Sequence, residues 1–198
     1  AAQRKAEQGE SLHEVLLRAA QHYRNQLKDA PLAIAYLKKR GLSGDIAKRF
    51  GIGYVPDEWQ NLAAAFSDYD GPMLATAGLV KQKEDGKRYD VFRNRIMFPI
   101  ADTAGRIVAF SGRTFGKDAH PDAPKYLNSP ETALFIKSRI LYGFDRAKQT
   151  IRKHNFSILV EGQLDLIMSH QAGWANTVAV SGTAFTNEHA ALLKRMSD

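Results

Sequence analysis

The first part of the chain carries apolar residues at helical intervals. Leu12, Leu16 and Ala19 recur three or four positions apart, and Ser11 with Glu14 has the spacing of a capping box at a helix start. Shorter helices are predicted after Pro31, which suits a first helical position, and after Ser43, which suits an N-cap. Two further short helices are expected within residues 59–66 and 72–77.

From residue 79 the pattern changes from helical to extended. Two pairs of short apolar segments, each pair separated by a turn-rich stretch, lie at 79–81 with 88–92 and at 96–101 with 107–111. Each pair predicts a β-hairpin. Residues 11–143 are therefore expected to form an α+β subdomain whose β part is strongly basic.

The last third of the chain has a different pattern of apolar and polar residues. Two short apolar runs, 157–160 and 177–180, each end in a polar residue and a glycine and lead into a helical segment. This order predicts a βαβα unit with buried parallel strands over residues 144–198. Because a helix that leaves a parallel strand normally leads to another strand, we expect this α/β domain to be truncated. The polar residues 1–10 are expected to be a linker.

Composition narrows the function classes. The chain has 198 residues, 44% hydrophobic and 25% charged, as in an ordinary globular protein. No apolar run approaches the ~20 residues that span a bilayer, so no membrane segment is expected. The absence of cysteine excludes a disulfide framework, a cysteine-ligated zinc site and thiol catalysis. A net charge of +7 favours a polyanionic partner.

Two carboxylates stand out in the α/β part. Glu161 follows the first apolar strand, at the strand end where open parallel sheets bind ligands, and Asp165 comes one helical turn later. Two such groups suit a hard cation such as Mg²⁺. The alternative is that Glu161 is an ordinary turn residue and Asp165 only favours the positive end of the helix.

Basic residues form a second set of candidates. Arg93 and Arg95 are two positions apart before a strand, so they are expected to share a face and form a phosphate-binding row, unless they are ordinary solvated charges. Aromatic residues that could stack nucleic-acid bases, or belong to the core instead, are Tyr89, Phe92 and Tyr126.

Other site classes lack their signatures. The six histidines show no metal-ligand spacing, so surface positions are expected for them. Residues 181–183 lack the full nucleophile-elbow pattern, residues 51–53 lack the rest of a dinucleotide fingerprint, and no Walker-type loop is present.

Several motifs together resemble the RNA polymerase core of bacterial DNA primases of the DnaG type. They occur in family order from about residue 31 to the end, at residues 36–42, 49–54, 92–100, 109–113, 124–132, 137–143 and 160–165. The resemblance implies a basic N-terminal subdomain followed by the start of a TOPRIM domain.

The resemblance also implies roles for individual residues. Glu161 matches the strand-end carboxylate of TOPRIM enzymes, which serves at the metal site or in acid–base chemistry, and Asp165 matches the motif's second acidic position. Residues at positions that handle the nucleotide triphosphate and the template–primer backbone are Arg49, Arg95, Arg113, Lys125, Asn128 and Lys137, with Arg93 and Arg139 as less close matches.

The activity implied for the parent protein is synthesis of short RNA primers on a single-stranded DNA template by metal-dependent nucleotidyl transfer. The implied cofactor is Mg²⁺ or Mn²⁺, with no zinc in this segment. The implied partners are template DNA, the RNA primer, ribonucleoside triphosphates and, through a domain absent here, the replicative helicase. The expected location is the cytoplasm, at the replisome.

One departure from the family pattern bears on activity. The family's Asp-x-Asp metal pair lies on the next TOPRIM strand, and residues 144–198 contain no such pair. The chain alone is therefore expected to be inactive. Two other functions stay open: a non-catalytic single-stranded-DNA-binding module, and another TOPRIM enzyme such as a type IA topoisomerase or a nuclease, which the basic motifs before Glu161 fit less well.

Overall fold

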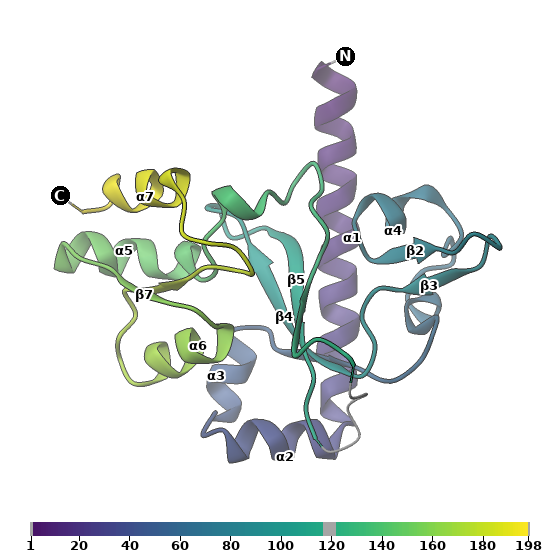
Figure 1. Cartoon of the computed structure of the whole chain (residues 1–198), viewed down its shortest axis with the longest axis horizontal. Helices are drawn as coiled ribbons and strands as arrows, with labels where there is room; N and C mark the ends of the chain where they lie inside the picture. Colours follow the sequence, from purple (N-terminus) through teal and green to yellow (C-terminus); the bar gives the residue numbers. More distant parts are fainter. Residues whose placement is uncertain (1, 117–121, 198) are drawn as a thin grey trace. The chain divides into compact units, whose positions relative to one another are not determined.

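The computed structural model describes residues 2–116 and 122–197 and divides the chain into two compact units. The N-terminal unit comprises residues 1–99 and 109–134, and the C-terminal unit comprises residues 100–108 and 135–198. In Figure 1 the colours follow the residue numbers, from purple at the N-terminus to yellow at the C-terminus. Within the described residues, no helix is both long enough and apolar enough to cross a membrane.

The N-terminal unit is built on one long helix, α1 (Ala2–Lys28). The segment expected to be a linker is helical in its described part, and Ser11 lies inside the helix rather than at its cap. Alanine, glutamine, glutamate and lysine are good helix formers, which explains the extension. Leu12, Leu16 and Tyr23 are buried along the inner face of α1, as their spacing predicts.

Shorter helices of this unit begin where the sequence predicts. Pro31 occupies the first turn of α2 (Pro31–Lys39), and the Ser43 hydroxyl accepts a hydrogen bond from the Ile46 amide at 3.2 Å to cap α3 (Gly44–Arg49). The 59–66 segment forms only the 3-10 helix η1 (Asn61–Ala64), and 72–77 forms α4 (Pro72–Thr76).

Both predicted hairpins are confirmed. The first is β2 (Val80–Gln82) with β3 (Arg88–Asp90), and the second is β4 (Arg95–Ala101) with β5 (Ile107–Arg113). The second hairpin gains two outer strands, β1 (Gly53–Val55) and β6 (Tyr126–Asn128), in the order β1-β4-β5-β6. Neither outer strand was predicted, because neither is a run of apolar residues flanked by turn signals that would mark a strand.

Close packing joins α1 to this sheet. A Cβ atom placed on Gly53 of β1 would lie 2.6 Å from the Tyr23 Cβ, closer than real carbon atoms approach. Glycine at this position therefore lets the helix lie directly on the strand. The Tyr23 ring meets the Phe110 ring of β5 edge to face, with centroids 5.3 Å apart.

The C-terminal unit confirms the predicted βαβα order. After the 3-10 helix η2 (Lys137–Arg139) come α5 (Phe144–His154), β7 (Ile158–Val160), α6 (Gln163–Gln171), β8 (Thr177–Ala179) and α7 (Asn187–Lys194). Strands β7 and β8 are parallel, and Tyr142 forms an antiparallel bridge to Ala179 on β8. Phe144, Ile151 and Val178 are buried in the core between α5 and β8.

A hydrogen-bonded latch fastens η2 to the start of α7. Thr186 caps α7 by accepting from the His189 amide at 3.1 Å, and its hydroxyl donates to the Ser138 carbonyl at 2.6 Å. The Thr186 amide donates to His189 Nδ1, so Nε2 carries the proton and donates to the Lys137 carbonyl at 2.9 Å.

The expectation that histidines lie on the surface was wrong for two of them. His189 belongs to this latch, and His170 is buried with Nε2 2.9 Å from the Thr177 carbonyl. Both ring nitrogens of His189 are hydrogen-bonded to backbone groups, and the Thr177 carbonyl is a partner for Nε2 of His170, which lowers the cost of burying these side chains. His120 lies outside the described residues.

Candidate functional site

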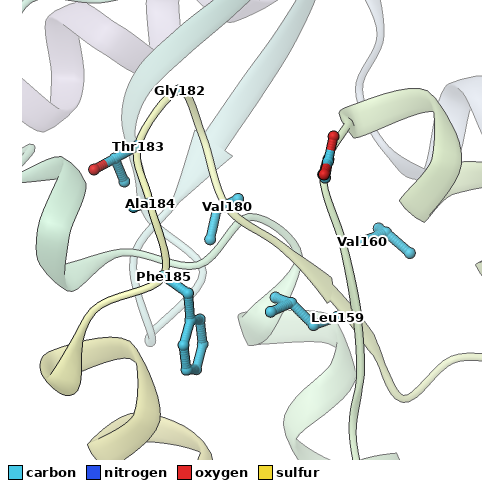
Figure 2. Close-up of a pocket in the computed structure, with 8 residues that line it drawn as sticks. Leu159, Val160, Val180, Gly182, Thr183, Ala184 and Phe185 are labelled. Atoms are coloured by element: carbon cyan, nitrogen blue, oxygen red, sulfur yellow. The ribbon is translucent and has the colours of Figure 1, made fainter.

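Glu161 stands at the carboxyl end of β7, as the sequence predicts. It is exposed, and Gly162 with extended backbone angles separates it from α6. It lines a pocket of about 460 Å³ between the end of β7 and the loop that follows β8. In Figure 2, Leu159 points toward Val180 and Phe185, whereas Val160 points the other way. The pocket thus combines one carboxylate with an apolar wall.

The two loops that form this pocket are tied together behind it. Gln163, in the first turn of α6, is buried and its side-chain amide donates to the Ser181 hydroxyl at 3.4 Å. This bond joins the loop after β7 to the loop after β8. It therefore links the carboxyl ends of β7 and β8.

Asp165 is placed differently from Glu161. It lies in the first turn of α6, is exposed, and does not line the pocket. The described residues bring together no group of three or more histidine or acidic side chains that could hold a metal ion. Carboxylate oxygens are ligands that Mg²⁺ prefers, so these two residues stay candidates for a metal site.

Arg95 is buried at the start of β4 and bonds to the backbone. Its Nη1 atom donates to the Gly112 carbonyl at 3.1 Å and to the Pro124 carbonyl at 2.9 Å. A Cβ on Gly112 would lie 2.8 Å from the Arg95 Cδ, so glycine makes room for this side chain. Burial, and then the charge of Arg93, lower the pKa of the Arg95 guanidinium. Arg95 therefore holds the segment before β6 against the sheet.

The expected row of Arg93 and Arg95 is not formed. Asn94 between them has φ 48°, in the left-handed region, so the alternation of a regular strand does not apply. Strand β4 begins only at Arg95, and the Arg93 guanidinium lies 3.5 Å from the centroid of the Trp59 ring.

Three buried polar atoms on β5 and β6 have no hydrogen-bond partner within the described residues. They are Ser111 Oγ, Arg113 Nε and Asn128 Oδ1. Ser111 and Asn128 are paired across the strands, and Ser111 and Arg113 are two positions apart, so the three share one sheet face. Such atoms are costly unless a ligand or water satisfies them. One face of this sheet therefore carries three buried polar atoms that lack a partner within the described residues.

Aromatic rings hold Arg113 in place. Its guanidinium carbon lies 5.2 Å from the Tyr36 centroid and 5.4 Å from the Tyr126 centroid. Both distances are within the range of cation–π attraction. Tyr126 precedes Asn128 on β6, so the predicted base-stacking ring serves here as a support for the arginine.

The other predicted basic residues are scattered. Lys125 is exposed beside β6, where its carbonyl accepts from the Thr114 amide at 3.0 Å. Arg49 is exposed at the last residue of α3. Lys137 and Arg139 lie on η2 in the C-terminal unit, held by the latch to α7.

Trp59 is a candidate that the sequence analysis missed. Its side chain is 55% exposed, and besides Arg93 it has Lys83 Nζ at 4.7 Å from its centroid and the Tyr89 ring at 6.0 Å. We call Trp59, Lys83, Tyr89 and Arg93 the aromatic platform. Exposed rings among cations are the usual surface for stacking single-stranded nucleic acid. Lys83, Tyr89 and Arg93 lie within eleven residues of one another, whereas Trp59 is 24 positions before Lys83, so the fold brings the tryptophan to the other three.

A buried carboxylate fastens the platform to the unit. Asp90 is fully buried, its amide donates to the Trp59 carbonyl at 2.8 Å, and its carboxylate accepts from the Tyr69 hydroxyl at 2.7 Å and the Leu62 amide at 3.0 Å. Burial raises the pKa of Asp90 to about 6, although both hydrogen bonds lower it.

Comparison with known families identifies both parts of the chain. The family described as "DNA primase catalytic core, N-terminal domain" matches residues 22–148, and the Toprim domain family matches residues 155–198. The chain belongs to the DNA primase family. The resemblance inferred from the sequence motifs is thereby confirmed, as is the fold class.

Individual relatives agree with this assignment. The DNA primase of Legionella pneumophila is 46% identical over 186 residues, which are 93% of this chain and 32% of that protein. The DNA primase of Pseudomonas putida is 45% identical over 191 residues, 93% of this chain and 28% of that protein. The chain thus spans about a third of the length of these curated relatives.

Solved structures share the fold. The RNA polymerase domain of Mycobacterium tuberculosis primase DnaG is 36% identical with a TM-score of 0.86, covering 94% of this chain and 61% of that one. A DnaG primase catalytic domain solved with bound single-stranded DNA is 39% identical with a TM-score of 0.86, covering 97% of this chain and 62% of that one. The α+β unit and the βαβα unit of this chain therefore have the fold of these catalytic domains.

Proposed function

We propose that this chain is part of the catalytic core of an enzyme that synthesises short RNA primers on single-stranded DNA. The observation that carries the proposal is Glu161, an exposed carboxylate beside a pocket at the carboxyl end of a parallel strand, within a Toprim domain. The reaction is attack of a primer-end 3′-hydroxyl on the α-phosphorus of a ribonucleoside triphosphate, with pyrophosphate leaving. The proposal places the enzyme in the cytoplasm at the replisome.

Glu161 and Asp165 are the residues that would hold a divalent cation, Mg²⁺ or Mn²⁺. The bound ion would supply Lewis-acid stabilisation of charge on the phosphates. Glu161 acts as a ligand or accepts the proton of the attacking hydroxyl. No zinc is needed for either role.

The basic residues bind the phosphates and the template in this proposal. Arg113 and Asn128 present unpartnered buried polar atoms on one sheet face, which suits a phosphate or a nucleotide hydroxyl. Lys125, Lys137, Arg49 and Arg139 add positive charge, and Arg95 fixes the loop that carries Lys125. A related catalytic domain solved with bound single-stranded DNA supports a DNA-binding role for this fold.

The test is primer synthesis by two polypeptides on a single-stranded template. The first is residues 1–198, and the second continues the same reading frame beyond Asp198. We expect the first to be inactive, because residues 144–198 contain no Asp-x-Asp pair, and the second to incorporate labelled ribonucleotides into short products. A longer polypeptide that contains such a pair and makes no RNA contradicts the proposal. Relaxation or cleavage of DNA by it supports a different TOPRIM enzyme. The domain division at residues 11–143 and 144–198 and the partnership with a replicative helicase remain part of the proposal.

The aromatic platform favours a second function for the chain alone, which is binding of single-stranded DNA without catalysis. Trp59 is exposed among two cations and a tyrosine, so it can stack a base while phosphates contact Lys83 and Arg93. Fluorescence anisotropy with labelled oligodeoxythymidine tests this function. We expect binding that weakens steeply with added salt, and no binding at low salt contradicts it.

A further inference from the structure

A second hollow in the N-terminal unit takes no part in the proposed reaction. It has a volume of about 530 Å³ and lies among α1, α2 and α3, which form three sides of a bracket in Figure 1. We call it the helical groove. Its volume is within the roughly 300–1,000 Å³ typical of ligand pockets.

The floor of the helical groove is aliphatic. Leu37, Leu42 and Ile52 are buried at its base, and Leu27 and Ile34 are half-buried along its sides. No aromatic residue lines it. Covering an aliphatic surface that is open to water with an apolar side chain lowers the free energy, so the floor favours an apolar occupant.

The rim of the groove is positive. Arg24, Lys28, Lys38 and Lys48 line it and are exposed, and no acidic residue lines it. Within the part of the chain that the structure describes, none of these four forms a salt bridge. Asp45, the nearest carboxylate in sequence to Lys48, is exposed outside the lining. The rim therefore selects an anionic occupant with apolar groups.

We infer that the helical groove binds an acidic amphipathic helix of a protein partner. Such a helix places apolar side chains at i, i+3 and i+4 on the floor and carboxylates along both edges, which is the usual helix-in-groove mode. Arg24 and Lys28 are four residues apart on α1, so they match carboxylates spaced by one turn on the partner. This binding is separate from the proposed catalysis and does not depend on it.

The same features disfavour other anions. Single-stranded nucleic acid stacks its bases on aromatic rings, which the groove lacks and the aromatic platform provides. A fatty acid has one carboxylate, whereas the four cations come from three helices and surround the floor. Carboxylates distributed along a peptide engage all of them.

The experiment uses the whole chain and a fluorescent helical peptide of leucine, glutamate and alanine. Two matched pairs of variants separate the groove from the general positive charge. Lys38→Glu changes the rim, whereas Lys39→Glu makes the same charge change beside it; Ile34→Gln changes the side wall, whereas Leu32→Gln changes an exposed leucine outside the groove. We expect Lys38→Glu to weaken peptide binding about tenfold and Lys39→Glu less than about twofold.

Each outcome decides the inference. The inference is supported if both groove variants bind the peptide more weakly, both control variants bind it normally, and excess oligodeoxythymidine has no effect. Four results overturn the inference. A scrambled peptide of the same composition binds equally well, or Lys38→Glu and Lys39→Glu have equal effects. Alternatively, oleate or oligodeoxythymidine displaces the peptide at lower concentration, or peptide binding does not saturate. Thermal melting of each variant checks folding, and the two lysine variants suffice if Ile34→Gln is unstable.

Discussion

In the N-terminal unit three of the candidate cations are held by rings or carbonyl groups, whereas in the C-terminal unit the two candidate carboxylates are exposed. Arg113 lies between Tyr36 and Tyr126, Arg93 lies on Trp59, and Arg95 is fixed by two carbonyls. No hydrogen bond or salt bridge among the described residues fixes the side chains of Glu161 and Asp165.

This difference suits two functions, binding of a polyanion by the N-terminal unit and binding of a cation by the C-terminal unit. A polyanion binds best to cations whose positions are fixed in advance, because less side-chain entropy is lost on binding. A carboxylate that holds a cation needs solvent access until the ion arrives. We therefore expect substitutions in the N-terminal unit to weaken binding, and substitutions of the carboxylates to abolish chemistry and leave binding intact.

The largest effect is expected for Glu161→Gln. Primer synthesis by a polypeptide that makes primers should fall by roughly 100-fold or more, because charge stabilisation at the metal is lost. Affinity for single-stranded DNA, measured by anisotropy, should stay within about twofold, because the phosphate-binding residues are unchanged. Glu188→Gln, which changes an exposed carboxylate in the first turn of α7, is the control. Near-normal primer yield for Glu161→Gln would remove this residue from the catalytic site.

Asp90→Ala is expected to have the next largest effect, on stability. It leaves the buried Leu62 amide and Tyr69 hydroxyl without their acceptor, at about 1–3 kcal/mol each. Urea unfolding measures the loss, and Asp90→Asn, which keeps one acceptor, should lose less. Equal stability of all three proteins contradicts the anchoring role.

The pH dependence tests the same carboxylate. Its pKa is about 6 in the folded protein against 3.8 unfolded, so the unfolded state releases its proton at lower pH. Stability contributed by Asp90 should therefore decrease as pH rises from about 4 to about 6 and change little above that range. Asp90→Asn should remove this component of the pH profile. A profile identical in both proteins contradicts the raised pKa.

Trp59→Ala should weaken binding of single-stranded DNA about tenfold, which is within the measured range for one stacked base. Trp174→Ala, at the other tryptophan of the chain and equally exposed, should bind normally. Each variant keeps one tryptophan, so fluorescence quenching reports on one ring at a time. Quenching of Trp174 by DNA, with Trp59 unaffected, would place the contact in the other unit.

The smallest effect is expected for Lys125→Ala. Loss of one exposed phosphate contact should reduce affinity a few-fold and the salt slope of log K by about one. Lys87→Ala, which removes an exposed lysine at the tip of the first hairpin, is the control. An unchanged salt slope would exclude Lys125 from the phosphate contacts.

Local signals made most of the fold predictable from the sequence. Pro31 and Ser43 mark helix starts because their effects depend only on neighbouring backbone groups. The two apolar runs, each followed by a polar residue and a glycine, predicted the parallel strands β7 and β8 and placed Glu161 at the end of β7. Strands β1 and β6 were not predicted, because each is a short segment that pairs with a longer strand distant in sequence, β4 or β5.

The parts of the site that could not be predicted depend on contacts distant in sequence. Trp59 meets Arg93 only because the turn at Asn94 directs that arginine away from the strand. Alternation along an ideal strand therefore predicted wrongly that Arg93 and Arg95 share one face. His189 was expected on the surface, because nothing in its own segment indicates that the Lys137 carbonyl lies beside it.

The latch between His189 and Lys137 has a consequence for synthesis of the protein. The two residues are 52 positions apart, and a ribosome makes the chain from its N-terminus. The η2 segment, with its two basic side chains, therefore leaves the ribosome well before the histidine that fastens it. We expect this part of the surface to acquire its final arrangement only when α7 has emerged, after the N-terminal sheet has had time to pair.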